Sequence, residues 1–448
     1  MSLTLPERRT GSPSAPTTAS APPTSRGPVG GVAEAARPLL HALLGDPLPV
    51  RIEFWDGTGA GPDDGPGTLS VRSPDVFRHL LWAPGELGLG RAFVTGQLDV
   101  DGDIFEVLST LRDAVQFDGR AVRTLPAVVR SARAVGALGR PLPHPPEEAT
   151  PRGRRHSKGR DAAAISHHYD VGNDFYDIVL GPAMTYSCAR FTTPEMDLAD
   201  AQAAKHELIC RKLGLHERSG MRLLDVGCGW GSLALHAAHR HRATVVGVTI
   251  SQAQVERARA RVEAAGLTGQ VEIRLQDYRD LAGEQFDAIS SVGMFEHVGV
   301  ARTEEYFTTL RALLPDHGRL LNHAISSVAG SRLSRHSFAG RYVFPDGELL
   351  DVGDVVLAME RAGFEVRDVE SLREHYARTL RAWVENLEAR WDDAVALVGE
   401  PRARVWRLYM AASAVGFTDG GLGLHQVLGV VPAPDGSSGM PATRRHWD

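Results

Sequence analysis

The segment 223–238, LLDVGCGWGSLALHAA, places a glycine-rich turn directly between a strand-like apolar run and a helix-like one. Glycine allows left-handed backbone and close approach to a ligand, and a helix N-terminus aims free amide groups at polar or negative groups. The turn therefore predicts an α/β fold with a ligand bound where the strand ends. Its G-x-G-x-G spacing differs from the G-x-G-x-x-G of dinucleotide binders, and no P-loop lysine follows, which disfavours nicotinamide and nucleoside triphosphate cofactors.

Short apolar runs alternate with helical patterns from residue 207 onward. The runs are MRLLDVG at 221–227, ATVVGVT at 243–249, VEIRLQD at 271–277, FDAISSVG at 286–293 and GRLLNHAIS at 318–326. Strands that alternate with helices in this way predict a doubly wound parallel sheet. We therefore expect a Rossmann-like α/β domain over residues 161–431.

The chain has 448 residues, more than one domain usually holds, so we expect a second, smaller core. Residues 29–115 show short apolar runs broken by glycine and aspartate, the pattern of a small α+β domain. Within it, SPDVFRHLLW at 73–82 predicts a helix with Ser73 as N-cap and Pro74 as first helical residue. The apolar face of that helix is expected to consist of Val76, Phe77, Leu80 and Leu81.

Three segments have compositions expected outside the two domains. Residues 1–28, rich in Pro, Ser, Thr and Ala, predict a disordered tail, and residues 432–448 predict a flexible one. Residues 116–160 predict a basic linker, whose first half, RAVRTLPAVVRSARAVGAL, has the spacing of a basic amphipathic helix. Such a helix can lie on an anionic lipid surface or form a solvated connection between domains, and the spacing leaves both interpretations open.

Charge and cysteine content exclude several classes of protein. A formal net charge of -6 excludes a globally basic nucleic-acid binder, and no nucleic acid is expected as a partner. No apolar run reaches the roughly 20 residues of a membrane span, and no secretory signal is evident, so we expect a cytoplasmic location. The three cysteines, Cys188, Cys210 and Cys228, have neither C-x-x-C pairing nor zinc-like histidine spacing, so neither disulfides nor a metal site are predicted.

Seven short motifs occur in a fixed order along the chain. They are HHYDVGNDFY, YSCARF, DVGCGWG, GVTIS, MFEHVG, YVFPDGEL and HYARTLRAW. Together they resemble the cyclopropane fatty acid synthase family of class I S-adenosylmethionine-dependent methyltransferases. LGLGRAFVTGQLDVDGD, at 87–103, resembles the smaller N-terminal domain of the bacterial phospholipid-acting members.

The resemblance implies S-adenosylmethionine as cofactor, bound around the glycine-rich turn. Most class I enzymes end the second strand with an acidic residue, but here the chain reads VVGVTISQAQ, as in this family, where Thr249 and Gln254 take that role. At the adenine end, Tyr278 with Arg279, or instead Asp277, is the expected contact. The expected cofactor-binding residues are Tyr186, Ser187, Asp225, Gly227, Gly229, Gly231, Thr249, Gln254, Asp277, Tyr278 and Arg279.

The family transfers the methyl group of S-adenosylmethionine to a cis double bond of an acyl chain. An alkene is a weak nucleophile, so the sulfonium has to be held in line and water kept out. Aromatic faces stabilise the resulting carbocation, which suggests a role, or equally plain core packing, for Tyr169, Phe175, Tyr176 and Tyr186. The resemblance implies that a bound bicarbonate removes the proton, held by Cys188, Glu296, His323, Ile325 and Tyr376.

The resulting prediction is cyclopropane formation on unsaturated acyl chains of membrane phospholipids, with the stretch 167–191 as a lid over the acyl site. His167, His168, Asn173 and Asp174 are expected to cap and pin this lid rather than to do chemistry. The alternative product is a 10-methylene or 10-methyl branched chain of the tuberculostearic-acid type, formed after a hydride shift.

Two rival functions from other classes remain. One is a protein that only binds lipid, and the other is a small-molecule or sphingolipid methyltransferase. Because the expected substrate lies in a bilayer, an anionic membrane surface is the expected partner, with the protein peripheral to its inner face. The resemblance also suggests a homodimer and, for a methylene product, a partner reductase.

Overall fold

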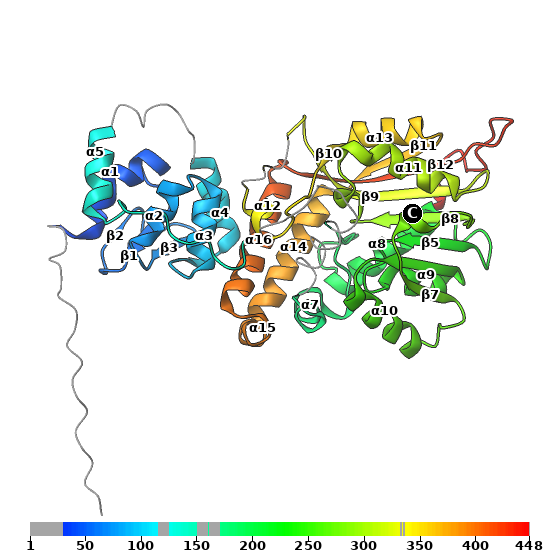
Figure 1. Cartoon of the computed structure of the whole chain (residues 1–448), viewed down its shortest axis with the longest axis horizontal. Coiled ribbons are helices and arrows are strands. Elements are labelled where there is room, and N and C mark those ends of the chain that lie inside the picture. Colours follow the sequence, from blue (N-terminus) through cyan, green and yellow to red (C-terminus); the bar gives the residue numbers. More distant parts are fainter. Residues whose placement is uncertain are drawn as a thin grey trace, which may run out of the picture.

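The computed structural model describes residues 30–114, 125–149, 160, 171–331, 334 and 337–447. The expected tail at 1–28 lies outside these residues. Figure 1 shows two units side by side, a smaller N-terminal one in blue and cyan and a larger one that holds the long sheet, with orange helices between them.

The N-terminal unit is built on a four-stranded sheet in the order β2-β1-β3-β4. Its strands are β1 (Arg51–Phe54), β2 (Gly59–Ala60), β3 (Gly67–Val71) and β4 (Leu98–Gly102). β1 and β3 are parallel, and the other neighbours are antiparallel. Its helices are α1 (Gly31–Leu44), α2 (Asp75–Trp82), α3 (Glu86–Val94), α4 (Ile104–Ala114) and α5 (Leu125–Ala134). The unit thus mixes α and β structure, as the sequence predicts.

Helix α2 differs from the prediction at both ends. It begins at Asp75, whose amide donates to the Ser73 hydroxyl at 3.2 Å, so Ser73 lies one position further from the helix than expected. Leu81, expected on the buried face, is 50% exposed. His79 is buried instead, because it lies three residues after Val76 and therefore on the same helical face.

Helix α5 belongs to the segment expected as a basic linker, but it packs on α1. Ala132 is buried in this contact, and the Ser131 hydroxyl donates to the Ala35 carbonyl at 2.6 Å. Arg130 and Arg133 are exposed. The described part of this segment is therefore not a free connection, since its helix completes the N-terminal unit with one face and presents arginines on another.

The larger unit contains an eight-stranded sheet in the order β11-β12-β9-β8-β5-β6-β7, with β10 paired to β9. The strands are β5 (Arg222–Val226), β6 (Thr244–Thr249), β7 (Val271–Leu275), β8 (Ala288–Val292), β9 (Arg319–Ser327), β10 (Leu350–Asp351), β11 (Glu365–Ser371) and β12 (Gly423–Val430). The five runs that the sequence predicts as strands are β5 to β9, and all five pair in parallel.

Strand β12 breaks the expected all-parallel arrangement, because it runs antiparallel between β9 and β11. The chain leaves β11, passes through α14 (Arg373–Ala389), α15 (Trp391–Val398) and α16 (Glu400–Thr418), and re-enters the sheet at the same end. A strand that returns from the end where its neighbour stopped has to run the opposite way. The sheet is therefore mixed at this edge.

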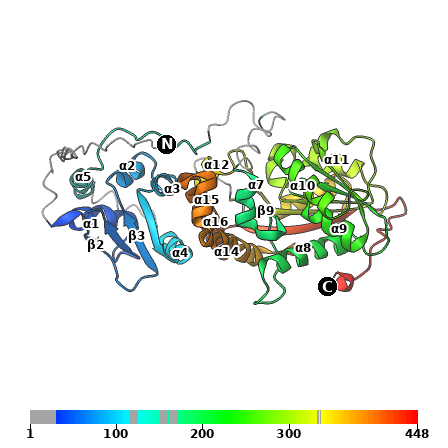
Figure 2. The ribbon, with the colours of Figure 1, turned by 90° about the horizontal axis from the view of Figure 1, so that it is seen from below.

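Helices cover both faces of the sheet. On one side are α8 (Leu198–Lys212), α9 (Ser232–His241) and α10 (Gln252–Ala264), and on the other are α11 (Thr303–Ala312) and α13 (Val352–Arg361). Figure 2, seen from below, shows α8 and α9 on one side of the sheet and α11 on the other. The remaining elements are α7 (Asn173–Leu180), α12 (Phe338–Tyr342), η2 (Gly181–Ala183), η3 (Tyr278–Asp280), η4 (Phe295–His297), η5 (Val300–Arg302) and η6 (Arg444–His446). Both faces of the sheet are covered, which agrees with the doubly wound prediction.

One hydrophobic cluster extends from the N-terminal unit into helices α7, α14 and α16 of the larger unit, whose sheet has a further cluster on each face. Helices α3 and α4 pack on α16, and α3 also meets α12. Gly90 in α3 lies so close to Phe338 that a Cβ there would come within 2.2 Å of the ring. Buried Glu148, near the end of the expected linker, accepts from Arg91 at 2.9 Å and from Arg341 at 2.7 Å. The N-terminal unit is therefore fixed to the larger one.

The C-terminal segment, expected as a flexible tail from residue 432, packs against the larger unit as far as it is described. Arg444 forms an ion pair with Asp368 of β11 at 2.6 Å. Trp447 is 7% exposed and joins the core on the α8 side of the sheet. Among the described residues, no helix is long and apolar enough to cross a bilayer.

Candidate active site

A pocket lies at the carboxyl ends of β5, β6 and β8, where ligands bind in open α/β sheets. It encloses about 1180 Å³ of empty space, part of it open to solvent. Ten of the eleven expected cofactor-binding residues line it. They are Tyr186, Ser187, Asp225, Gly227, Gly229, Thr249, Gln254, Asp277, Tyr278 and Arg279. We call this the cofactor pocket.

Two glycines of the turn have different surroundings, since one faces the cofactor pocket and the other faces α10. Gly229 has φ 55°, and nothing lies within 4 Å of a Cβ built on it, so a side chain there would enter the cofactor pocket. Gly231 is the residue that does not line the pocket. It is the N-cap of α9 at φ 78°, and its Cβ would lie 3.5 Å from Ala258 of α10. Gly231 therefore shapes the turn and the packing of α9 on α10.

The polar residues of the cofactor pocket at the ends of β6 and β7 are already paired with one another. The Thr249 hydroxyl donates to Gln254 Oε1 at 2.7 Å. The carboxylate of Asp277 accepts from the guanidinium of Arg279 at 2.8 and 2.5 Å. Burial raises the pKa of Tyr278 to about 12, which keeps its hydroxyl protonated. This side of the pocket thus offers an aromatic ring beside a neutralised ion pair.

A smaller pocket of about 570 Å³ adjoins the first and shares Tyr186, Ser187, Gly293 and His297 with it. All five residues expected around the proton acceptor line this smaller pocket. They are Cys188, Glu296, His323, Ile325 and Tyr376. They come from the segment after η2, from η4, from β9 and from α14, so the fold brings together residues that are far apart in the sequence. We call this the base pocket.

Glu296 is the buried carboxylate of the base pocket. Its Oε1 accepts a hydrogen bond from the Ile325 amide at 2.8 Å. Its Oε2 is buried and has no hydrogen-bond partner among the described residues. Burial raises the pKa of this carboxyl to about 7. Because buried polar atoms are nearly always hydrogen-bonded in folded proteins, the unpaired oxygen indicates a place for a ligand.

His323 of β9 is the complementary donor. Gln426 Nε2 lies 3.2 Å from His323 Nδ1 and, with the side-chain amide in this orientation, donates to it, so the ring proton sits on Nε2. That Nε2 is buried and without a partner among the described residues. Burial, and then the positive charges of Lys205 and Lys212, hold the pKa of His323 well below its usual range. The imidazole is therefore a neutral N–H donor facing the pocket.

Cys188 and Tyr376 also line the base pocket, Cys188 with a protonated thiol and Tyr376 with a packed ring. The Cys188 thiol donates to the Ala189 carbonyl at 3.1 Å, and burial raises its pKa, so it stays protonated. The Tyr376 ring packs against Phe417 and Trp383. A protonated thiol is a weak donor and a poor nucleophile, so covalent catalysis by Cys188 is not favoured.

The aromatic residues expected to face a cation divide into three groups. Tyr186 lines both pockets. Phe175 and Tyr176 are fully buried, line neither pocket, and pack against Trp406. Tyr169, like His167 and His168, lies outside the described residues. For Phe175 and Tyr176 the structure therefore supports plain core packing.

Among the residues that line the pockets but were not singled out from the sequence are Lys205, Trp230 and Phe344. Trp230 lies within the DVGCGWG motif, and Phe344 within YVFPDGEL. The Trp230 indole donates to Asn173 Oδ1 at 2.8 Å, and Asn173 Nδ2 donates to the Ala253 carbonyl at 3.2 Å. Asn173 thereby pins α7 to the glycine-rich turn and to α10, the kind of role that the sequence predicts for it.

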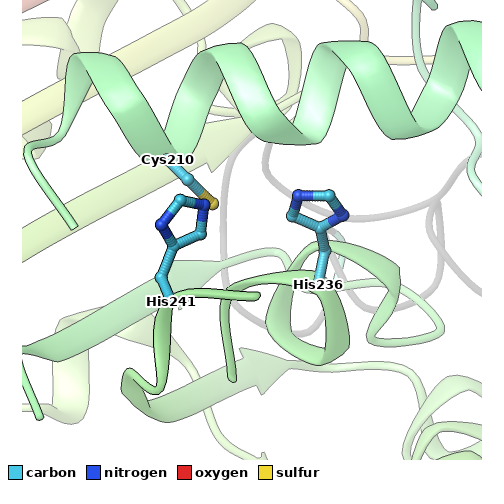
Figure 3. Close-up of side chains that lie close together, drawn as sticks. All are labelled: Cys210, His236 and His241. Atoms are coloured by element: carbon cyan, nitrogen blue, oxygen red, sulfur yellow. The ribbon is translucent and has the colours of Figure 1, made fainter. Parts of the chain in front are cut away.

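A cluster with metal-ligand chemistry lies between α8 and α9, away from both pockets. Figure 3 shows Cys210 facing His236 and His241, and their potential ligand atoms lie within 4.8 Å of one another. Both imidazoles already contact Glu207 Oε2, at 3.1 and 3.0 Å. Because these contacts engage Nε2 of each imidazole and burial keeps Cys210 protonated, we assign the cluster to the packing of the two helices.

Residues 156–427 match the family model described as mycolic acid cyclopropane synthetase. The chain belongs to this family. It is 46% identical over 410 residues to a probable fatty acid methyltransferase of Mycobacterium tuberculosis, covering 89% of this chain and 94% of that one. It is 35% identical over 364 residues to the cyclopropane-fatty-acyl-phospholipid synthase of Escherichia coli K12, covering 81% and 87%.

The family is one of S-adenosylmethionine-dependent fatty acid methyltransferases, and this chain is such an enzyme. Its larger unit has the class I methyltransferase fold. The crystal structure of a mycolic acid cyclopropane synthase, complexed with SAH and CTAB, superimposes with a TM-score of 0.56 at 33% identity. That match covers 60% of this chain and 97% of the other, so the N-terminal unit lies largely outside it.

Proposed function

We propose that this enzyme converts cis double bonds in the acyl chains of membrane phospholipids into cyclopropane rings, with bicarbonate as the bound base. The observation that carries the proposal is the base pocket beside the cofactor pocket. It presents one unpaired carboxylate oxygen, on Glu296, and one unpaired N–H, on His323.

The donor and acceptor of the base pocket fit bicarbonate chemically. Bicarbonate has an O–H that needs an acceptor and anionic oxygens that need donors. Glu296 Oε2 is an acceptor and His323 Nε2–H is a donor, both buried and both free for a ligand among the described residues. When bound there, bicarbonate supplies the acceptor for the proton that a cyclopropane-forming reaction has to lose. The pocket residues hold and orient that acceptor.

The remaining walls of the base pocket suit a carbocation. Tyr186, Phe344 and Tyr376 line it, together with Leu349 and Leu424. Aromatic faces attract positive charge without forming a bond to it, and apolar walls keep out water that would trap the cation. Tyr186, which also lines the cofactor pocket, lies where a methyl donor in one pocket can face an alkene in the other.

Access to phospholipid acyl chains requires contact with a bilayer, and we place that contact on the N-terminal unit. Trp82 is 54%, Leu81 50% and Leu138 48% exposed. Trp82 Nε1 donates to the Gly139 carbonyl, so Trp82 and Leu138 lie near each other. Arg140, which follows Gly139, is also exposed, and exposed tryptophan and leucine beside an arginine are typical of proteins that lie on anionic lipid surfaces. The enzyme would then be cytoplasmic and peripheral to the inner face of the membrane.

This membrane contact is tested by charge removal. Replacing Arg130 and Arg133 by Gln, together with Arg123, which lies outside the described residues, should weaken binding to anionic vesicles and flatten its salt dependence. Replacing Trp82 by Ser should weaken binding to neutral and anionic vesicles alike. Binding to vesicles that is unchanged in both variants would remove the N-terminal unit from the contact.

The product is tested in a bacterial host that lacks such enzymes, supplied with oleate and labelled methionine. Gas chromatography with mass spectrometry of the phospholipid fatty acids should show a labelled chain larger by one CH2 that carries a ring. A labelled open chain with a methylene branch (C=CH2) would establish the 10-methylene alternative and call for a partner reductase. No labelled lipid would overturn the proposed substrate. Sedimentation of the purified enzyme would test the homodimer suggested by the family resemblance.

A further inference from the structure

Two buried lysines of α8 differ in their partners. Lys205 and Lys212 are each 1% exposed. Lys212 Nζ contacts two carboxylates, Asp368 at 2.8 Å and Glu370 at 2.5 Å. For Lys205 Nζ the described residues supply one hydrogen-bond acceptor, the Ser187 hydroxyl at 2.9 Å, and no ion pair. Because a buried ammonium is costly without a counter-charge, Lys205 lacks the partner that Lys212 has.

An anionic partner for Lys205 can bind in the cofactor pocket, because Lys205 lines that pocket. An ammonium carries three N–H donors, and Ser187 uses one of them. Asp225 acts on Lys205 through space, but its Oδ1 accepts instead from the Ser290 hydroxyl at 2.9 Å. Burial lowers the pKa of Lys205 to about 7 and raises that of Asp225 to about 6. A ligand with complementary charges would favour the charged form of both groups.

The position of Lys205 along the pocket points to one end of the cofactor. Ser187 and Asp225 surround it, and Asp225 is in β5. Asp277 and Arg279 follow β7, which lies two strands away from β5, or about 10 Å at the usual spacing of strands. The family resemblance places the adenine at residues 277–279, which leaves the glycine-rich turn at the end of β5 for the methionine part of the cofactor. Lys205 is therefore at the methionine end.

We propose that Lys205, with Ser187, binds the α-carboxylate of the methionine moiety of S-adenosylmethionine. This inference rests on the proposed function, because it needs that molecule in the cofactor pocket. The carboxylate is the anionic group of the ligand, whereas its amino and sulfonium groups are cations that an ammonium repels. Asp225, at the same end, is placed to accept the amino group. The pair would then recognise both charges of an amino acid.

The base pocket is a less suitable place for the partner of Lys205. Its lining includes Ser187 and His323 but not Lys205. The ammonium does reach His323 electrostatically, since its charge helps to lower the pKa of that imidazole. A carboxylate on Lys205 would reduce this effect, so filling the cofactor pocket would also change the electrostatics of the base pocket.

The test compares two ligands on two proteins by isothermal titration calorimetry. Decarboxylated S-adenosylmethionine keeps the adenosine, sulfonium and amino groups and lacks only the carboxylate. The wild-type enzyme should bind it about ten- to a hundredfold more weakly than S-adenosylmethionine, as expected for a charge-assisted hydrogen bond. In Lys205→Met, the affinity for S-adenosylmethionine should fall by a similar factor, and the dissociation constants of the two ligands should then lie within about twofold of each other.

Two control variants separate binding from folding. Lys212→Met removes the other buried lysine of the same helix, and Lys205→Arg keeps the charge at the site. Both should still prefer the ligand that has the carboxylate. Equal weakening of both ligands in Lys205→Met would show that Lys205 has only a structural role. If Lys205→Met does not fold, a wild-type enzyme that binds the two ligands equally well overturns the inference by itself. A wild-type enzyme that binds neither ligand overturns the proposed function instead.

Discussion

The cofactor pocket is built around the glycine-rich backbone at the end of β5, with further lining residues from the ends of β6, β7 and β8, whereas the base pocket has no such turn and is assembled from side chains of several distant segments. In the cofactor pocket, an open space above Gly229 and mutually paired polar groups leave room for a large ligand. In the base pocket, Glu296 and His323 each keep one buried polar atom unpaired. The first arrangement favours shape recognition of a whole cofactor, and the second favours a small polar group. Changes in the first should therefore act on binding, and changes in the second on turnover.

The largest effect should come from filling the cofactor pocket. Gly229→Val places a branched side chain in the open space at φ 55°, a conformation that β-branched residues avoid. We expect S-adenosylmethionine binding and activity to fall below detection, while circular dichroism and a cooperative thermal transition show that the chain still folds. Affinity close to that of the wild type would contradict the place assigned to the cofactor.

The next largest effect should come from the base pocket and should spare the cofactor. Glu296→Gln keeps the size of the side chain and the acceptor for the Ile325 amide, but it removes the carboxylate. Turnover should fall by about a hundredfold or more, as expected when a positioned base is disturbed. The dissociation constant for S-adenosylmethionine, measured by calorimetry, should change by less than about twofold. Equal losses in binding and turnover would remove the distinction between the pockets.

Deprotonation of Glu296 as the pH rises should increase turnover and decrease the stability of the fold. Burial raises its pKa in the folded enzyme from 4.5 to about 7, so turnover that needs the carboxylate should rise as pH increases through about 7. The folded state then binds a proton more tightly than the unfolded state, so this group stabilises the fold below pH 4.5 and loses that effect as pH rises through 7.

Chemical denaturation of the wild type and Glu296→Gln measures this linkage. Between pH 4.5 and pH 8, the stability of the variant relative to the wild type should rise by on the order of 3 kcal/mol. Because both proteins share all other titrating groups, their contributions cancel in the difference. A difference in unfolding free energy that does not change with pH would show that Glu296 is not a buried carboxylate.

A smaller effect is expected from the residue that orients His323. Gln426→Leu removes the donor to Nδ1, so the imidazole can place its proton on either nitrogen. Turnover should fall by about tenfold, in the range of one lost hydrogen bond, with S-adenosylmethionine affinity unchanged. Gln426→Glu should lower turnover further than Gln426→Leu, because an acceptor beside Nδ1 would draw the proton away from Nε2. Equal activity in the two variants would show that the position of this proton does not matter.

The smallest effect is expected from the other glycine of the turn. Gly231→Ala places a Cβ 3.5 Å from Ala258, an ordinary contact, at φ 78°. The left-handed backbone should cost about 1–2 kcal/mol of stability, seen as a lower melting temperature. Affinity for S-adenosylmethionine should change by less than about threefold, in contrast to Gly229→Val. A loss of binding as large as that of Gly229→Val would mean that Gly231 also faces the cofactor.

The same contrast explains what could be predicted from the sequence. The glycine-rich turn and strands β5 to β9 follow local rules of spacing, and the structure confirms them. Glu296 and His323 have no local pattern of their own, because their relation exists only after β8 and β9 pair. Only the resemblance of short motifs to a known family linked them before the structure. Whether they hold bicarbonate stays a prediction.

The errors in the sequence interpretation have a shared cause, which is tertiary contact. The antiparallel β12 depends on where α14 to α16 return the chain. Helix α5 was expected in a free linker and instead packs on α1, and Trp447 was expected in a flexible tail and is buried. Lys205 in the run AQAAKHEL looks like a solvent-exposed helical lysine. Only the burial of α8 against the sheet shows otherwise.

Turnover in carbonate-depleted buffer tests most directly whether the base pocket holds bicarbonate next to the methyl donor. Purified wild-type enzyme, S-adenosylmethionine and phospholipid vesicles would be assayed under CO2-free gas, with bicarbonate added back in steps. We predict that activity falls on depletion and is restored by bicarbonate with saturation, and that Glu296→Gln shows no such response. Wild-type turnover that is the same with and without bicarbonate would contradict the claim.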